Sequence, residues 1–403
     1  MLAPTRSMAS GLRVVIHTAP ESELVSAALA VRVGYRNETS AWSGLAHLAE
    51  HIACGADTPG ARALAAAGGT CNAETYPDFT VYHGSAAVEH SALLTNRLLE
   101  VLAVKEISAE RIHGEVTIVT DELSAAVDGA VTGGFPWLWL PAALYHEPEF
   151  AHNGYGDLDS LGQVTSEVLA EFFARHYIAD NAVLAVCVPD PTSLPARIPL
   201  LPRGTPPARS DRLPVVTPGS ATVVSAPEQP HQATAVAWSL PFLPLTAGHL
   251  RTAVLADVLV GPHDGILEDS LPEALEVAAY VGPSADPWDV SAPLPFVVEV
   301  HHEADEDPLA VPAAVHTALK ECDVGEDLVV AAARRMATQL RQRLVDPVTL
   351  PMLSVASELA HGGIERLAEV PALLTATSPA DVRAAAAELV DAPYRVLTRG
   401  PHP

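Results

Sequence analysis

The amino-acid sequence predicts an α+β fold of two sheet-and-helix domains with similar topology, joined by a proline-rich linker. Three observations support this fold class. Strand-like segments with alternating or β-branched apolar residues precede helical patterns in the first half, and a similar order recurs in the second half. Between the halves, prolines are too frequent for a helix or a sheet to continue. We therefore expect domains at residues 1–190 and 219–403, with the linker at 191–218.

The first half begins with two predicted strands, at residues 11–19 and 24–35, in which apolar and β-branched residues alternate. Ser43 offers an N-cap for a helix over 44–53. The next elements are a helix at 58–68, two strands around a turn at Pro77–Asp78, helices at 88–104, 108–126 and 166–177, and a strand at 182–189. This order indicates a sheet with helices packed on it.

The second half follows a similar order more loosely. Its predicted elements are a strand at 234–240, a helix at 250–261, a strand at 294–302, and helices near 308–322, 325–344 and 350–362. No residue-level repeat relates the two halves, so a duplication is supported by the order of the elements alone.

Charge and composition limit the classes of partner. The chain has 49 acidic and 23 basic residues, a formal net charge of -26. Such a surface repels phosphate backbones, so we expect no nucleic-acid partner. No apolar run has the length of a signal peptide or a membrane span, which predicts a cytoplasmic protein without a membrane partner. Four widely spaced cysteines without a CxxC pair argue against a disulfide framework and against a thiolate zinc site.

The predicted helix at 44–53 contains the first candidate ligands. His47 and His51 are four residues apart with Glu50 between them, on the face opposite the apolar residues of the helix. Two histidines at this spacing can present nitrogens to one ion, and zinc commonly takes such a pair together with a third protein ligand. The glutamate would then reach the water on the metal. The alternative is the solvated polar face of an ordinary amphipathic helix.

Glu115 and Glu122 offer the third ligand. They are seven residues apart in the predicted helix at 108–126 and fall on the same side as its apolar residues. A carboxylate on a buried face is costly unless it is paired with a cation or bound to a metal. A metal site is favoured because the histidine pair also needs a third ligand, and a salt bridge to Arg62 or Arg111 remains the alternative.

The order His47-x-x-Glu50-His51, followed by two glutamates, resembles the inverted zinc motif of the pitrilysin/insulinase metallopeptidase family. Three further stretches resemble the family: residues 43–56, 65–83 and 161–188. The resemblance covers residues 10–190 well and the remainder in outline. It implies a small two-domain subunit of the bacterial type, similar to mitochondrial processing peptidase, that forms half of a peptidase clamshell.

The resemblance also implies roles for the candidate residues. His47, His51 and Glu122 correspond to zinc ligands, Glu50 to the general base, and Glu115 to a carboxylate that orients one of the ligands. The cofactor implied is Zn²⁺.

Substrate binding is implied at a different stretch. The strand around Asn72 and Ala73 corresponds to the one that pairs with an extended peptide, a mode that reads backbone more than side chains.

The second half departs from the family pattern. There the family has an arginine and, thirteen residues later, a tyrosine, which together bind the substrate carbonyl. Tyr280 stands in a plausible place, but Leu267 occupies the arginine position, and no arginine occurs between Arg251 and Arg334. Tyr280 is therefore either a substrate-binding residue or part of the core. The resemblance implies a heterodimer in which a homologous chain supplies the arginine and tyrosine.

These observations predict a zinc-dependent metalloendopeptidase subunit whose active site is completed by a partner chain. Its substrates would be peptides, and processing of a leader peptide is one possibility by analogy. The alternative is a non-catalytic relative that assembles or binds peptides. The glutamate at position 50 argues against it, because a binding module needs no base there. A metal-buffering role is less consistent with a single histidine pair and no cysteine ligand.

Overall fold

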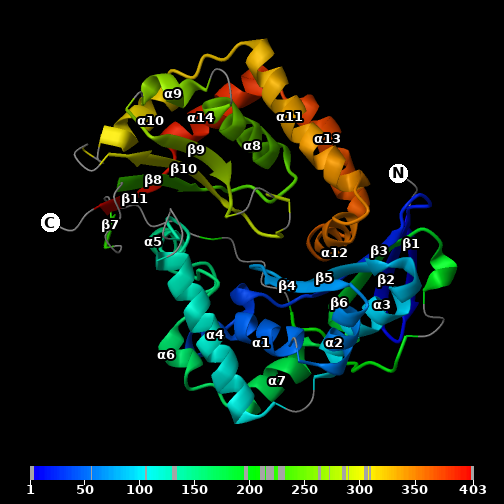
Figure 1. The fold of residues 1–403 in the computed structure, drawn as a ribbon. Coiled ribbons are helices and arrows are strands. Elements are labelled where there is room, and N and C mark those ends of the chain that lie inside the picture. The colour runs from blue at the N-terminus through cyan, green and yellow to red at the C-terminus, as the bar shows by residue number, and fades with distance from the viewer. Residues whose placement is uncertain are drawn as a thin grey trace. The chain divides into compact units, whose positions relative to one another are not determined.

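A computed structural model describes residues 4–55, 57–104, 107–128, 134–194, 198–208, 214, 222–225, 232–261, 265–271, 273–283, 287–288, 290–303, 307 and 310–400 (Figure 1). The chain divides into two compact units, each with its own sheet and helices, and the α+β fold class is confirmed. Unit 1 contains Met1–Asp121, Gly154–Ser210 and Gln342–Leu367; unit 2 contains Glu122–Asn153, Asp211–Arg341 and Ala368–Pro403. None of the described helices combines the length and the hydropathy needed to span a bilayer.

The units do not follow the halves of the sequence. The predicted domains 1–190 and 219–403 are each continuous, whereas unit 1 takes a segment from the second half and unit 2 takes one from the first. Apolar side chains explain the second exchange, because Phe135, Leu140 and Leu144 pack in the core of unit 2. Part of the predicted linker lies outside the described residues, so its boundaries stay a prediction.

The sheet of unit 1 has six strands in the order β1-β2-β6-β3-β5-β4. Their bounds are β1 Thr5–Ala9, β2 Leu12–Thr18, β3 Leu24–Val31, β4 Thr70–Thr75, β5 Thr80–Ala87 and β6 Ala182–Val188. β2 and β6 are parallel, and the other neighbours are antiparallel. Every residue of β6 is buried, as expected for a central apolar strand, whereas β4 lies at the edge and pairs only with β5 among the described strands.

Helices cover both faces of this sheet. Those of unit 1 are α1 Leu45–Cys54, α2 Pro59–Ala66, α3 Ser91–Glu100, α6 Leu158–Leu161, α7 Ser166–His176, α12 Leu350–Ala360 and the first part of α4 Ala109–Asp128. Successive residues of a strand point to opposite faces. Leu29 of β3 accordingly joins the core that contains α1, α3 and α7, whereas Ala28 and Ala30 join a second core with Val355 and Leu359 of α12.

Unit 2 has a five-stranded sheet in the order β7-β11-β8-β10-β9. Its strands are β7 Thr222–Ser225, β8 Gln232–Ser239, β9 Glu276–Val281, β10 Pro295–His302 and β11 Tyr394–Gly400. Its helices are α5 Leu140–Leu144, α8 Ala247–Val260, α9 Ile266–Ser270, α10 Ala310–Lys320 and α14 Pro379–Asp391, with most of α11 Glu326–Val345 and α13 Ile364–Thr375. α11 and α13 cross the division between the units, as does α4.

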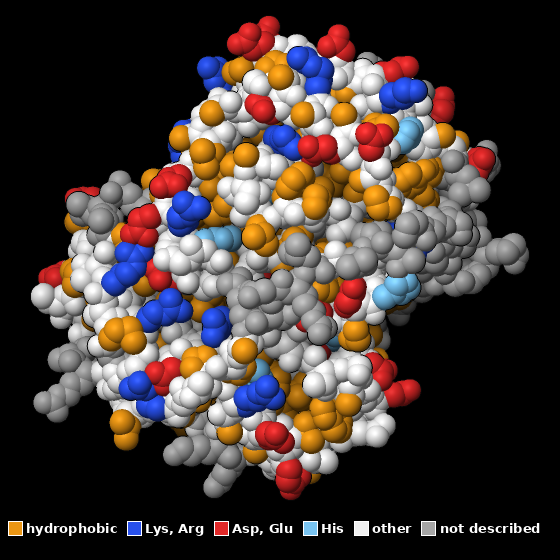
Figure 2. Space-filling view, turned by 180° about the vertical axis from the view of Figure 1, so that it is seen from behind, with side chains coloured by type: hydrophobic (Ala, Val, Ile, Leu, Met, Phe, Trp, Pro, Cys, Tyr) orange, Lys and Arg blue, Asp and Glu red, His pale blue; other side chains and the backbone are white. Residues whose placement is uncertain are grey.

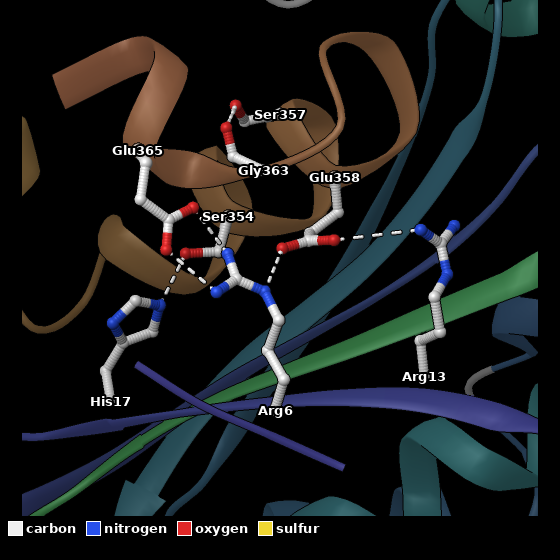
Figure 3. Close-up of polar contacts among 8 residues, drawn as sticks. All are labelled: Arg6, Arg13, His17, Ser354, Ser357, Glu358, Gly363 and Glu365. Atoms are coloured by element: carbon white, nitrogen blue, oxygen red, sulfur yellow. Dashed lines mark hydrogen bonds and ion pairs between the residues drawn. The ribbon is translucent and has the colours of Figure 1, made fainter. Parts of the chain in front are cut away.

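A polar cluster within unit 1 joins β1 and β2 to α12 and to the first turn of α13 (Figure 3). Arg6 donates from Nε to Glu358 at 2.7 Å, and from its two terminal nitrogens to Glu365 at 2.8 and 2.6 Å. Arg13 lies 3.7 Å from the second oxygen of Glu358, whose side chain is only 5% exposed. A nearly buried carboxylate needs such cationic partners, so the two arginines tie α12 to the sheet.

His17 belongs to the same cluster and gives the fold an expected sensitivity to acid. It is buried, its Nε2 lies 2.6 Å from Ser354 Oγ, and burial lowers its pKa to about 4. In the unfolded chain the imidazole has its ordinary pKa of about 6.5. As pH falls through this interval, the unfolded chain gains a proton that the folded chain does not, so this site loses stability.

We expect His17→Gln to lessen the fall in unfolding free energy between about pH 7 and about pH 5 by roughly 1 to 2 kcal/mol. The glutamine amide can keep a contact with Ser354 but does not titrate. Urea denaturation at the two pH values measures the effect. His113→Gln, at an exposed histidine, is the control and should retain the wild-type pH dependence. An equal fall in His17→Gln and in the wild type would contradict the prediction.

Candidate metal centre

Helix α1 carries the histidine pair and is buried on almost every side. It starts after Gly44, whose φ of +95° is in the left-handed region that favours glycine. Glu50 is only 8% exposed, and His47 and His51 are half-buried. The alternative of a solvated polar face is therefore wrong for this helix.

Charged side chains bind both ends of α1. Glu38 accepts the backbone N–H groups of Gly44 and Ala46, each at 2.6 Å, at the positive end of the helix dipole. At the other end, the guanidinium groups of Arg97 and Arg111 donate to backbone carbonyls of the last turn. These contacts fix the position of the helix and so of its histidines. Arg111 had been an alternative salt-bridge partner for Glu115 and Glu122. In the structure its guanidinium binds α1 instead.

The structure brings together His47, His51 and Glu122. Their candidate ligand atoms all lie within 4.8 Å of one another, and the Nε2 atoms of the two histidines are 3.2 Å apart. The histidines come from successive turns of α1, and the carboxylate comes from α4. Glu122 is the first residue past the division between the units, and α4 is continuous across it.

The surroundings of His47 favour its uncharged imidazole. The pKa of His47 is lowered to about 4, mainly by burial and to a smaller extent by the neighbouring His51. The neutral ring is the form that binds a metal. Glu115 Oε2 lies 3.4 Å from Nδ1 of His51, on the opposite side of the ring from the nitrogen that faces His47. The ring of Tyr155 packs edge-on against His47, with 5.6 Å between the ring centroids.

The donor set fits zinc. Two imidazole nitrogens and one carboxylate oxygen are a frequent set at catalytic zinc sites, where three protein ligands leave a fourth position open. Zinc–ligand distances of about 2.0–2.2 Å place tetrahedral ligand atoms roughly 3–3.5 Å apart. The 3.2 Å between the histidine nitrogens falls in that range.

Glu50 lies between the two histidines in sequence but outside this donor set. Its Oε2 accepts a hydrogen bond from Thr75 Oγ1 at 2.8 Å, and Thr75 is the last residue of strand β4. The glutamate is thus held by a side chain of the edge strand.

The prediction for the burial of the glutamates is wrong in part. Glu115 is half-buried, but Glu122 is exposed. The reason is that the apolar stripe of α4 is narrow: Ile112 and Val119 are buried, whereas Ile118 is 46% exposed. Glu122 therefore lies at the solvent border of the stripe. Acidic side chains are scattered over the surface, as Figure 2 shows for one face, so the position beside two imidazoles is what distinguishes this one.

The residues predicted to bind substrate occupy two places. Asn72 and Ala73 lie on edge strand β4, opposite His83 and Tyr82 of β5, and β4 packs against α1. One edge of β4 is hydrogen-bonded to β5. The other edge has no neighbouring strand among those that the structure describes, so a further strand could pair there.

Tyr280 lies on β9 of unit 2. Its hydroxyl donates to Glu299 of β10, and burial and this carboxylate raise its pKa well above the usual range. Its ring packs near that of Trp137, with 6.0 Å between centroids. Leu267 is completely buried in α9. Substrate binding by Tyr280 stays a prediction.

Glu38 and Thr75 were not predicted from the sequence as residues of the site. Glu38 stands six residues before the first N–H that it accepts, so no local capping pattern reveals it. Thr75 was visible only as part of the resembling stretch 65–83, without a role.

Residues 13–132 match the family model described as insulinase, peptidase family M16. This part of the chain resembles that family. An uncharacterized zinc protease of Rickettsia felis is 26% identical over 182 residues, which are 44% of this chain and 44% of that protein. One of Mycobacterium tuberculosis is 28% identical over 191 residues, 46% and 43% of the two chains. Coenzyme PQQ synthesis protein F of Pseudomonas aeruginosa is 31% identical over 183 residues, 43% of this chain and 24% of that protein.

Each of these insulinase-like matches spans less than half of the relative's length. Solved structures extend the likeness of the fold to the whole chain. A protease from Helicobacter pylori superposes with a TM-score of 0.84 at 16% identity, covering 100% of both chains. The inactive domain of a peptidase M16 from Pseudomonas fluorescens has a TM-score of 0.78 at 17% identity, covering 100% of this chain and 98% of that one. At these identities the likeness concerns the fold.

Proposed function

We propose that this chain is a zinc-dependent endopeptidase subunit in which His47, His51 and Glu122 hold the metal and Glu50 is the general base. One observation carries the proposal. The candidate ligand atoms of two imidazoles on α1 and one carboxylate on α4 lie within 4.8 Å of one another, and α1 also carries a buried glutamate. The relatives named zinc proteases support the same chemistry.

In the proposed mechanism, the metal and the protein side chains have separate roles. Zinc, when bound, supplies a Lewis acid and lowers the pKa of the attacking water. Glu50 takes a proton from that water and returns it to the leaving nitrogen. The hydroxyl of Thr75 holds the carboxylate of Glu50 in place. Glu115, whose Oε2 lies 3.4 Å from Nδ1 of His51, orients that ring and favours the tautomer in which Nε2, the nitrogen that faces His47, is free to bind the metal.

The substrate class proposed is an extended peptide, for processing rather than general degradation of folded proteins. Edge strand β4 can accept a peptide as an additional strand, so main-chain hydrogen bonds at Asn72 and Ala73 would align it. Because β4 also contributes Thr75, a peptide paired with this strand would pass close to Glu50.

A partner chain is proposed to complete the site, giving a heterodimer. A buried leucine at position 267 cannot stabilise a negatively charged oxygen, and the hydroxyl of Tyr280 already donates to Glu299. A homologous chain that carries the arginine and tyrosine would supply those donors.

The metal part of the proposal is tested by elemental analysis of the purified chain. We expect about one zinc per chain, lost in His47→Ala and His51→Ala and strongly reduced in Glu122→Gln, because three protein ligands are the usual minimum. His113→Ala, at an exposed histidine of α4, is the matched control and should keep the metal. Full zinc in both α1 variants would overturn the ligand assignment, whatever the activity.

Glu115 is expected to act through His51. Glu115→Gln should leave zinc bound but weaken its affinity by about 10 to 100-fold, because the amide is a poorer partner for a ligating imidazole than a carboxylate. Competition with a chelator of known affinity measures the change. Glu110→Gln, in the first turn of the same helix, removes an equal charge from an exposed position and should have little effect. Equal affinities for the two variants would place Glu115 outside the metal site.

A further inference from the structure

Two cysteines lie together beside the candidate metal centre. Cys54 is the last residue of α1, and Cys71 is the second residue of edge strand β4. Helix and strand pack against each other, and both side chains border the same apolar core. Their thiols are hydrogen-bonding partners, and both side chains are half-buried, whereas Cys187 and Cys322 are buried. A small reagent can therefore reach the pair.

A buried arginine adds positive charge at the pair. Arg97 of α3 is only 2% exposed and donates to the carbonyl of Cys54. The hydrogen bond from the Cys54 thiol, together with Arg97, lowers the pKa of Cys71, while the same hydrogen bond raises that of Cys54. Cys71 is thus the thiol that ionises more readily, and the thiolate is the nucleophilic form of a cysteine. The neighbouring Cys54 thiol can then attack the mixed disulfide that Cys71 forms.

We propose that Cys54 and Cys71 form a reversible disulfide on reaction with a low-molecular-weight disulfide such as oxidised glutathione. The Cys71 thiolate attacks one sulfur of the reagent, forms a mixed disulfide and releases one glutathione thiolate. The Cys54 sulfur then attacks Cys71 Sγ, which breaks the mixed disulfide and releases the second glutathione. The two cysteines are oxidised together, one glutathione disulfide is reduced to two thiols, and the proton of Cys54 goes to the leaving glutathione.

The bond would tie the end of α1 to edge strand β4. This disulfide would close a loop of residues 54–71, which contains α2. This crosslink is independent of zinc and of cleavage, although its effect on peptide pairing at β4 depends on the function proposed above. Failure of that function would therefore leave the test below unchanged.

Peptide mapping of the intact chain tests the proposal. The protein is incubated with oxidised glutathione, alkylated while folded, and digested with trypsin without reduction. Cleavage after Arg36, Arg62 and Arg97 places the two cysteines on separate peptides, 37–62 and 63–97. We expect these peptides to be joined, and Cys187 and Cys322 to react only after unfolding. Cysteines that stay free, or carry glutathione without ever joining, would overturn the proposal.

Thermal unfolding provides a second measurement. Closing a loop of this size should raise Tm by roughly 5 °C, and dithiothreitol should reverse the rise. Cys71→Ser should show neither the joined peptides nor the rise, while Cys187→Ser should show both. Mapping of the wild type remains decisive even where a variant folds poorly. A rise in Tm that persists in Cys71→Ser would show that another bond is responsible.

Discussion

Glu50→Gln is expected to leave zinc bound and to lower peptide cleavage by about 10²–10⁴-fold. Glutamine is nearly the same size as glutamate and can still accept the hydrogen bond from Thr75 Oγ1, so the local packing should persist. It cannot take a proton from the attacking water, however, and the reaction loses its base. This substitution should have a large effect on cleavage for a small change in structure.

The measurement combines zinc content with cleavage rate in the presence of a competent partner chain. Glu110→Gln is the control, because it removes one negative charge at an exposed position and should keep both properties. Loss of zinc in Glu50→Gln would mean that this residue is a ligand rather than a base. Retention of both zinc and full activity would remove Glu50 from the mechanism.

The chain alone is expected to be nearly inactive on peptides even when fully loaded with zinc. The reaction builds negative charge on the carbonyl oxygen, and removing one preorganised donor typically costs about 10²–10³ in rate. By the resemblance, Leu267 corresponds to the arginine of the family, and its side chain is fully buried. A homodimer would therefore lack the donor at both sites.

The test compares the lone chain, at several concentrations, with the same chain mixed with a second chain of similar size. That chain should carry the arginine and tyrosine and lack His-x-x-Glu-His. Cleavage should appear in the mixture and should fall again when the partner's arginine is replaced by alanine. Robust turnover by the lone chain would contradict the divided site. Tight peptide binding without turnover in the mixture would instead favour the non-catalytic alternative.

Local patterns predicted much of unit 1. The continuous apolar run of β6 and the periodic apolar pattern of α1 are strong signals because each pattern matches the burial of its element. The predicted N-cap at Ser43 is wrong, because Gly44 occupies the N-cap position of α1. The pairing of β4 with β5 around Pro77–Asp78 was likewise predicted, since turn residues separate two strand-like segments. The convergence of α1 and α4 at His47, His51 and Glu122 followed from the resemblance as much as from the helical pattern.

Other elements were missed, for different reasons. β1 is polar and exposed, and its register is set by pairing with β2 rather than by an apolar pattern. α13 contains Pro371, which interrupts a helical reading. α14 did carry a signal, the capping box of Ser378 and Asp381, that was not used. The exchange of segments between the units has no local signature, because it depends on contacts between residues far apart in the chain.

The placement of α12 has a consequence for synthesis of the chain. All six strands of the first sheet precede residue 189, yet the helix that covers Ala28 and Ala30 begins at Leu350. At a typical rate of 5–20 residues per second, the ribosome needs on the order of 10 to 30 s to add the intervening residues. During that interval Ala28 and Ala30 lack the apolar contacts that α12 supplies. A chaperone that binds extended apolar surface would have its main opportunity then, and release would coincide with the emergence of α12.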